Sequence, residues 1–197
     1  MPTPKIESRN IQSRSLNFHY LESGEDHPGE DPVILLHGYP QTSHMWRKQL
    51  PVLGERFKVY APDTRGYGGT DKPHVRLDRS ILARDVLDFM DALGIEKARL
   101  VGHDWGGAIA WGVALGGQHM RVERAVIANA PHPQIFQRLL YTNPQQREAS
   151  QYIRGFRDSA HDPLVKEHGL TGPPLNEAKW DRPDAMEAEE RDALLRD

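Results

Sequence analysis

A carboxylate stands between two glycines in the segment 101–107, V-G-H-D-W-G-G. Gly102, Asp104 and Gly106 fit the pattern glycine-x-nucleophile-x-glycine, in which a reactive side chain sits on a sharp turn between a strand and a helix. The start of that helix offers free N–H groups and the positive end of its dipole, which keep a carboxylate ionised. We therefore interpret Asp104 as a nucleophile. The alternative is that Asp104 only caps the helix that follows it.

An aspartate nucleophile suits a saturated carbon that carries a leaving group. Its attack there forms an ester, and water can then attack the ester carbonyl and regenerate the carboxylate. A serine attacking the same carbon would leave an ether, which water cannot cleave in this way. An epoxide oxygen and a halide are leaving groups of the required kind. The sequence therefore predicts displacement at a saturated carbon by Asp104.

The elements that position Asp104 are predicted to be alternating strands and helices. Short apolar or alternating runs predict strands, and apolar residues at helical spacing predict helices. The expected strands are residues 14–22, 32–36, 57–61, 98–101 and 122–128, and the expected helices are residues 43–54, 78–93 and 105–115. Such alternation favours an α/β fold with an open, mostly parallel sheet and helices on both faces.

The sequence changes character after residue 133. One or two amphipathic helices are expected within residues 135–158, followed by a loop at 169–183 and a charged helix at 184–197. We expect two parts, a core over residues 1–133 and a helical region over residues 134–197.

Composition narrows the class of protein. The chain has 197 residues, a formal net charge of −3 and no basic stripe, so nucleic acid is not an expected partner. It has no cysteine, which excludes disulfides and thiolate metal sites. No apolar run reaches the ~20 residues of a membrane span, and the N-terminus lacks the apolar segment of a signal peptide. We expect a soluble, cytoplasmic protein that uses no metal ion or cofactor.

Four segments together resemble the α/β-hydrolase family, specifically its epoxide-hydrolase branch, which is related to the haloalkane dehalogenases. The segments are residues 37–40 (H-G-Y-P), 63–73 (D-T-R-G-Y-G-G-T-D-K-P), 102–107 (G-H-D-W-G-G) and 129–133 (N-A-P-H-P). The resemblance implies that residues 1–133 form the N-terminal part of an α/β-hydrolase core and that residues 134–197 form part of a helical cap.

The resemblance also implies roles for particular residues. The backbone N–H groups of Tyr39 and Trp105 would form an oxyanion hole. Tyr152 is a candidate for the cap acid that protonates an epoxide oxygen. The residues expected to bind a small-molecule substrate are His37, Pro40, Trp105 and His132. Residues 63–73 are expected to support the site.

The position of Tyr39 helps to choose a branch of the family. Haloalkane dehalogenases usually carry an asparagine there, whose side chain holds the departing halide together with the tryptophan after the nucleophile. Since this chain has Tyr39, an epoxide is favoured over a halide. Two alternatives stay open: a haloalkane or haloacid dehalogenase with the same nucleophile, and a truncated, non-catalytic binding protein with this fold.

The family's chemistry needs groups that are expected beyond Asp197. These are a histidine that activates water, an acid that orients the histidine, and a second cap tyrosine. Of the histidines in the chain, His103 is expected to point away from the pocket, and His161 and His168 are expected on the surface. Without the last core strands, one sheet edge would be unpaired, and a second copy of the chain could cover it.

Overall fold

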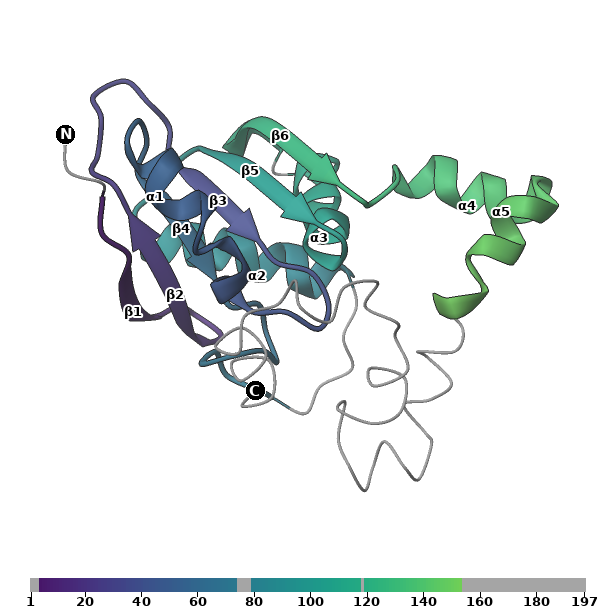
Figure 1. The fold of residues 1–197 in the computed structure, drawn as a ribbon, viewed down its shortest axis with the longest axis horizontal. Coiled ribbons are helices and arrows are strands. Elements are labelled where there is room, and N and C mark those ends of the chain that lie inside the picture. Colours follow the sequence, from purple (N-terminus) through teal and green to yellow (C-terminus); the bar gives the residue numbers. More distant parts are fainter. Residues whose placement is uncertain (1–3, 74–78, 118, 154–197) are drawn as a thin grey trace. The chain divides into compact units, whose positions relative to one another are not determined.

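The computed structural model describes residues 4–73, 79–117 and 119–153 of the 197-residue chain (Figure 1). Backbone contacts divide the chain into two compact units, residues 1–132 and residues 133–197. The charged helix expected at residues 184–197 and the histidines His161 and His168 lie outside the described residues.

Six strands and five α-helices, with two short 3₁₀ helices, make up the described part of the chain. The strands are Glu7–Gln12 (β1), Asn17–Ser23 (β2), Val33–Leu36 (β3), Val59–Pro62 (β4), Ala98–His103 (β5) and Val122–Ala128 (β6). The helices are Ser43–Trp46 (η1), Gln49–Gly54 (α1), Arg79–Ala92 (α2), Trp105–Ala114 (α3), His119–Arg121 (η2), Pro133–Thr142 (α4) and Pro144–Ala149 (α5).

The strands form one sheet in the order β1-β2-β4-β3-β5-β6. Strand β3 runs parallel to β4 and β5, and β5 runs parallel to β6, whereas β1 and β2 are antiparallel to their neighbours. The open, mostly parallel sheet predicted from the sequence is thereby confirmed. Because β3 and β5 point the same way, their carboxyl ends lie on the same side of the sheet, where the segments 37–40 and 102–107 begin (Figure 1).

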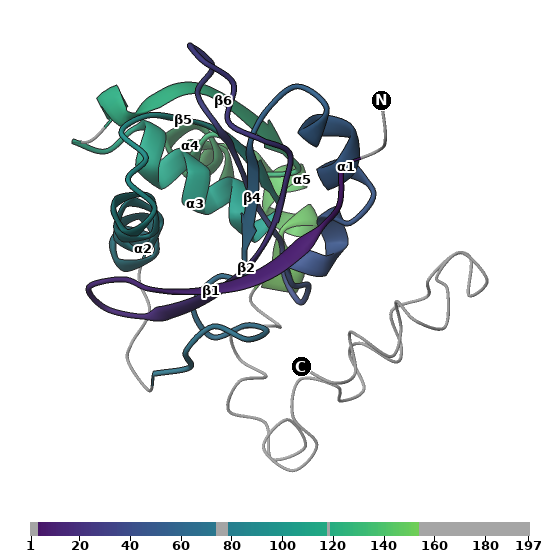
Figure 2. The same cartoon turned by 90° about the vertical axis from the view of Figure 1, so that its left-hand side faces the viewer.

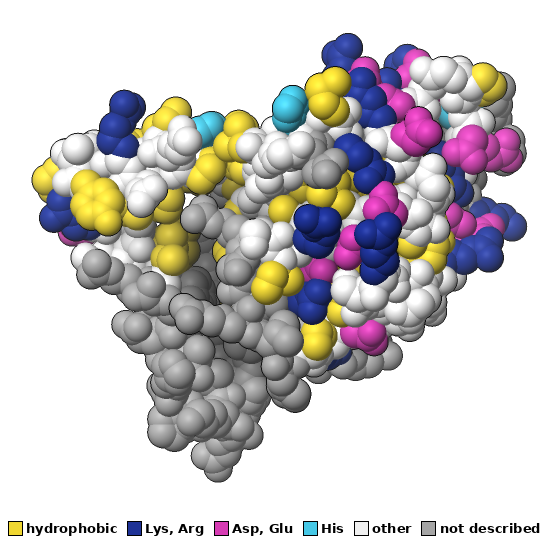
Figure 3. Space-filling model, turned by 180° about the vertical axis from the view of Figure 1, so that it is seen from behind, with side chains coloured by type: hydrophobic (Ala, Val, Ile, Leu, Met, Phe, Trp, Pro, Cys, Tyr) yellow, Lys and Arg dark blue, Asp and Glu magenta, His cyan; other side chains and the backbone are white. Residues whose placement is uncertain are grey.

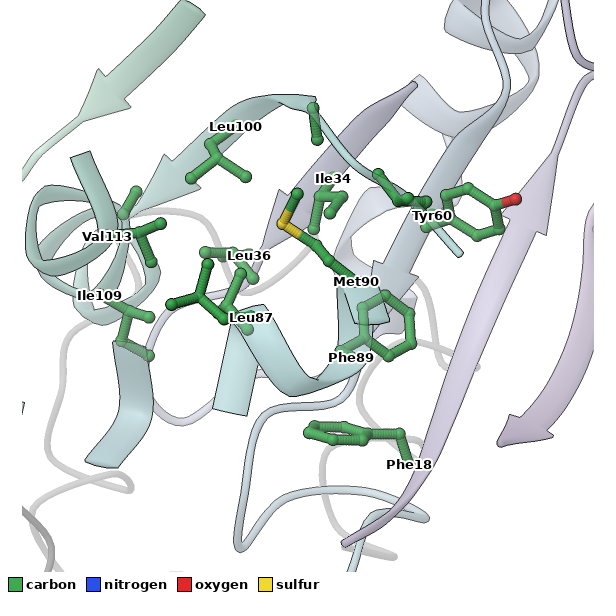
Figure 4. Close-up of a cluster of buried hydrophobic side chains, with 14 of the residues drawn as sticks. Phe18, Ile34, Leu36, Tyr60, Leu87, Phe89, Met90, Leu100, Ile109 and Val113 are labelled. Carbon is green, nitrogen blue, oxygen red and sulfur yellow. The ribbon is translucent and has the colours of Figure 1, made fainter. Parts of the chain in front are cut away.

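Helices cover both faces of this sheet, as the alternating pattern predicts. The helices α2 and α3 pack on one face, and η1 and α1 pack on the other (Figure 2). Strand β3 is buried on both sides because Ile34 and Leu36 face α2 and α3, while Val33 and Leu35 face α1. The larger core cluster is drawn in Figure 4, where Phe89 and Met90 of α2 lie between the helix and the sheet.

The sequence predicts no strand before residue 14, but the structure has one, β1, at residues 7–12. Residues 7–12 (E-S-R-N-I-Q) are almost entirely exposed and carry no alternating apolar pattern. They nevertheless form a strand, because they pair antiparallel with β2 from Glu7 against Glu22 to Gln12 against Asn17. Backbone pairing across a hairpin leaves no mark on hydrophobic periodicity, so this strand was missed.

Strand β6 forms the other edge of the sheet and is largely exposed. Its middle residues are exposed, and Val126 keeps 59% of its surface accessible.

Elsewhere on the first unit, basic and acidic side chains lie next to one another, as seen on the right of Figure 3. No helix in the described part of the chain is long and apolar enough to span a membrane.

The second unit is described up to residue 153. Asn143 caps helix α5: its side-chain Oδ1 accepts a hydrogen bond from the Gln146 N–H at 3.0 Å, and Pro144 is the first residue of the helix. The sequence predicts one or two helices within residues 135–158. Two helices are found there, α4 and α5, and α4 begins two residues earlier than predicted, at Pro133. Tyr152 belongs to this unit and is 62% exposed, so its role as a cap acid stays a prediction.

Candidate active site

Asp104 occupies a strained turn between β5 and α3. Its φ of 52° and ψ of −116° are uncommon for a residue with a side chain. The flanking glycines are required by close packing. A Cβ on Gly106 would lie 2.2 Å from the carbonyl oxygen of Leu36, and a Cβ on Gly102 would lie 2.4 Å from that of Gly106. The turn therefore fits between β3 and α3 only because both flanking residues lack side chains.

The Asp104 carboxylate is held by the segment that follows β3. The backbone N–H of Tyr39 donates a hydrogen bond to Asp104 Oδ1 at 3.0 Å. Asp104 precedes α3 and is in the capping position, yet its side chain makes no capping hydrogen bond to that helix. The geometry therefore contradicts the alternative in which this carboxylate only caps α3.

His37 supports the turn that carries the Tyr39 amide. Its ring Nδ1 lies 3.0 Å from the Gly38 carbonyl oxygen, and its Nε2 accepts the Thr64 N–H at 2.9 Å. Since Nε2 accepts from a backbone amide, the proton is on Nδ1 and is donated to Gly38. The imidazole is 1% exposed. These hydrogen bonds fix the turn before Tyr39, and the expected contact of His37 with substrate stays a prediction.

Tyr67 lies beside the same turn and was not singled out from the sequence. Its ring packs edge-on against His37, with centroids 5.2 Å apart. Burial raises the pKa of its phenol to about 12, and the neighbouring Tyr39 and the Asp104 carboxylate raise it further in the same direction. Burial likewise raises the pKa of Tyr39. The flanking glycines, Gly66 and Gly68, were a local sign that the backbone turns sharply at this tyrosine.

The shifted phenol makes stability depend on pH at the alkaline end. Because the folded state holds the Tyr67 proton more tightly, its contribution is full below the unfolded pKa of about 10 and is lost as pH rises through about 12. We expect the free energy of unfolding in urea to fall as pH rises through this window. Tyr67→Phe should show a shallower fall. An identical slope in the variant would contradict the assignment.

The remaining predicted residues lie around the carboxyl ends of the strands. Trp105 is the first residue of α3 and is 39% exposed, and Pro40 is half-buried. The ring of His132 packs edge-on against Trp111 at a centroid distance of 4.9 Å, and Trp111 donates its indole N–H to the Ala130 carbonyl at 3.0 Å. Trp111, which the sequence did not single out, thus anchors the segment after β6.

Other expectations concern His103 and metal ions. His103 follows Gly102 in β5, and its half-buried position alternates with the buried residues that face α2 and α3. Its Nδ1 has no hydrogen-bond partner among the described residues. Within residues 4–73, 79–117 and 119–153, no group of three or more histidine, aspartate or glutamate side chains is arranged to hold a metal ion.

The close approach at Gly106 gives a stability prediction. Gly106→Ala places a methyl group against two backbone carbonyl oxygens, those of Leu36 and His37, which cannot move independently of β3. We expect a loss of about 3 kcal/mol in the free energy of unfolding, measured in urea. Gly117→Ala is the matched control, because no atom lies within 4 Å of its added methyl group. Equal losses in both variants would contradict the packing argument.

The sequence matches known proteins over most of its length. Residues 31–174 match the family model described as alpha/beta hydrolase fold. Epoxide hydrolase 4 of Homo sapiens is 39% identical over 149 residues, which cover 75% of this chain and 40% of that protein. The soluble epoxide hydrolase of Corynebacterium sp. (strain C12) is 40% identical over 110 residues, which cover 56% of this chain and 37% of that protein. The chain thus spans about two fifths of the length of these curated relatives.

Solved structures give the same comparison in three dimensions. One of them is described as "Novel epoxide hydrolases belonging to the alpha/beta hydrolases superfamily in metagenomes from hot environments". It superimposes on this chain with a TM-score of 0.84 and is 55% identical in sequence, and the match covers 98% of this chain and 65% of that one. The epoxide hydrolase of Bacillus megaterium in complex with an inhibitor superimposes with a TM-score of 0.81 and 28% identity, covering 95% and 65%.

Proposed function

Because this chain belongs to the α/β-hydrolase fold family, we propose that it opens epoxides through a covalent ester on Asp104. One observation carries the proposal: Asp104 stands on a strained turn, its carboxylate accepts the Tyr39 amide, and it does not cap α3. The relatives with similar sequences and structures include proteins named as epoxide hydrolases, which supports an epoxide as the substrate.

The hydrogen bond from the Tyr39 N–H gives the two carboxylate oxygens of Asp104 different roles in the reaction. Oδ1 accepts the amide at 3.0 Å, and no hydrogen bond to Oδ2 is found among the described residues. Oδ2 is therefore the oxygen that attacks an epoxide carbon. A new C–O ester bond forms, the epoxide C–O bond breaks, and the released oxygen takes a proton from an acid. Tyr152 is our candidate acid, with the second unit acting as part of a cap.

Oδ1 then becomes the carbonyl oxygen of the ester. When water attacks Asp104 Cγ, negative charge develops on Oδ1, where the Tyr39 N–H already points. A donor placed in advance at that oxygen stabilises the tetrahedral intermediate. The N–H of Trp105 is the second proposed donor. His132 and Pro40 are proposed to contact the substrate, together with the indole of Trp105.

The test is to trap the ester. The chain is incubated with an aryl epoxide such as styrene oxide, digested with trypsin and analysed by mass spectrometry. Because the opened oxygen stays on the substrate, the peptide of residues 100–121 should gain the full mass of the epoxide, with the adduct on Asp104. Denatured chain is the control. An absence of adduct under saturating epoxide would contradict the proposal and favour the non-catalytic binding protein.

The same experiment addresses the dehalogenase alternative. An alkyl bromide would transfer its alkyl group to Asp104 and release bromide, so the adduct would lack the mass of the halogen. Trp105 beside the nucleophile is the feature that favours this alternative. We expect the epoxide to label Asp104 faster than the bromide does. Faster labelling by the bromide, with release of halide, would decide for the dehalogenase.

We also propose that a second copy of the chain covers the exposed edge of β6. The outer edge of this strand presents backbone groups that no described strand pairs, and Val126 is 59% exposed there. The mass in solution, measured by light scattering, should then be that of a homo-oligomer. Val126→Lys should shift it toward the monomer. A monomer in the unmodified chain would contradict this part of the proposal.

A further inference from the structure

A second hydrogen-bonded series of reactive side chains joins β1, β2 and the residue that follows β4. The Ser8 Oγ is 2.8 Å from the His19 Nε2, and the His19 Nδ1 is 2.6 Å from the Asp63 Oδ2. Serine, imidazole and carboxylate thus stand in the order and at the spacing of a nucleophile, its base and the group that orients the base.

Asp63 is suited to orient the imidazole. Its carboxylate is 2% exposed at the end of β4. Besides His19, it accepts the N–H of Ser43 at 2.7 Å and the N–H of Gly69 at 3.0 Å. An ionised carboxylate only accepts hydrogen bonds, so His19 donates Nδ1–H to it.

The tautomer of His19 follows from that contact. With the proton of the neutral ring on Nδ1, Nε2 carries the lone pair and accepts the O–H of Ser8. The pairing of the strands keeps this arrangement in place. Asn10 lies opposite His19, and Ser8, two residues away on the same face of β1, is its diagonal neighbour. Ser8 is exposed, and the His19 side chain is 22% exposed, so a reagent can reach the hydroxyl.

We propose that Ser8 is a second nucleophile, reactive toward activated esters of carboxylic and phosphonic acids. The Oγ bonds to the acyl carbon or phosphorus atom while its proton passes to His19 Nε2. The bond to the leaving group breaks, and an alkoxide leaving group takes the proton back from His19. Strand β1 is an edge strand, and its outward N–H groups, which no described strand uses, are the proposed donors to the developing oxyanion.

A fluorophosphonate probe tests the proposal. Its reaction forms a Ser8 Oγ–phosphorus bond, breaks the phosphorus–fluorine bond and releases fluoride, with the serine proton passing to His19. Trypsin isolates Ser8 in the peptide of residues 6–9, where it is the sole serine. Ser15 is an internal control, because it is also exposed and donates its hydroxyl to Asp88 rather than to an imidazole.

We expect Ser8 to be labelled at least ~100-fold faster than Ser15, the lower range for a positioned general base. The preference should vanish in urea, where the three side chains separate. His19→Gln should reduce Ser8 labelling to the level of Ser15, because glutamine can still donate an N–H to Asp63 but has no basic nitrogen. Equal labelling of the two serines in the folded chain, or unchanged Ser8 labelling in a folded His19→Gln variant, would overturn the proposal.

Discussion

Replacing Asp104 by asparagine is expected to lower the rate of covalent labelling by an epoxide about 10⁴-fold or more, in the range seen when an enzyme loses its nucleophile. The amide lacks the negative oxygen that attacks the epoxide carbon. Its Oδ1 can still accept the Tyr39 N–H, which the carboxylate accepts at 3.0 Å. The variant therefore removes the chemistry and keeps the geometry. Mass spectrometry of the peptide containing residue 104 measures the rate.

Asp26→Asn provides the matched control, since it makes the same chemical change at an exposed position in the loop before β3. The epoxide should label the Asp26→Asn variant at the same rate as the unmodified chain. The two variants should unfold at similar urea concentrations. Rapid labelling of Asp104→Asn at another residue would show that a different group is the nucleophile. His103 is the first group to examine in that case, because it adjoins residue 104.

Removal of the Asp85 carboxylate is expected to cost about 3–5 kcal/mol of folding free energy, the range for breaking one side of a buried ion pair. Arg65 Nε and Nη2 donate to the two carboxylate oxygens of Asp85, each at 2.6 Å. Both residues are buried, at 8% and 4% exposure. A guanidinium is always protonated in proteins, so Asp85→Ala leaves a buried charge that has lost both of these hydrogen bonds. Urea unfolding measures the loss.

The ion pair links the segment after β4 to α2, and its position explains why it matters for the site. Thr64, which donates to His37, is the neighbour of Arg65. Asp91→Asn is the control, because Asp91 pairs with Arg121 where the side chain is 39% exposed. Such an exposed pair should contribute at most about 1 kcal/mol. A loss of that small size in Asp85→Ala would contradict the buried-pair argument.

A double variant separates loss of the pair from loss of packing. Arg65→Met with Asp85→Leu replaces two charges by apolar side chains that fill much of the same space. Exchanging a buried ion pair for well-packed apolar residues is often neutral or stabilising. We therefore expect the double variant to be more stable than Asp85→Ala alone. A double variant as unstable as the single one would indicate that the charges themselves are required.

The sequence alone determined the open parallel sheet, its helical layers and the place of Asp104. These features have local signals: apolar runs predicted β3 and β6, apolar spacing predicted α2, and two glycines around a carboxylate predicted the turn between β5 and α3. Each signal extends over only a few neighbouring residues, because backbone sterics and periodicity act along the chain. They could be recognised without knowing which segments lie side by side.

Tertiary structure decided which distant groups meet. The Tyr39 amide reaches Asp104 across 65 positions, Arg65 meets Asp85 across 20, and His19 meets Asp63 across 44. It also decided that His37 bonds to Gly38 and Thr64, and that residues 7–12 form a strand. Such contacts depend on strand order, register and burial, which pairing of the whole sheet fixes. A residue's type limits the bonds it can make, but only the fold supplies its partner.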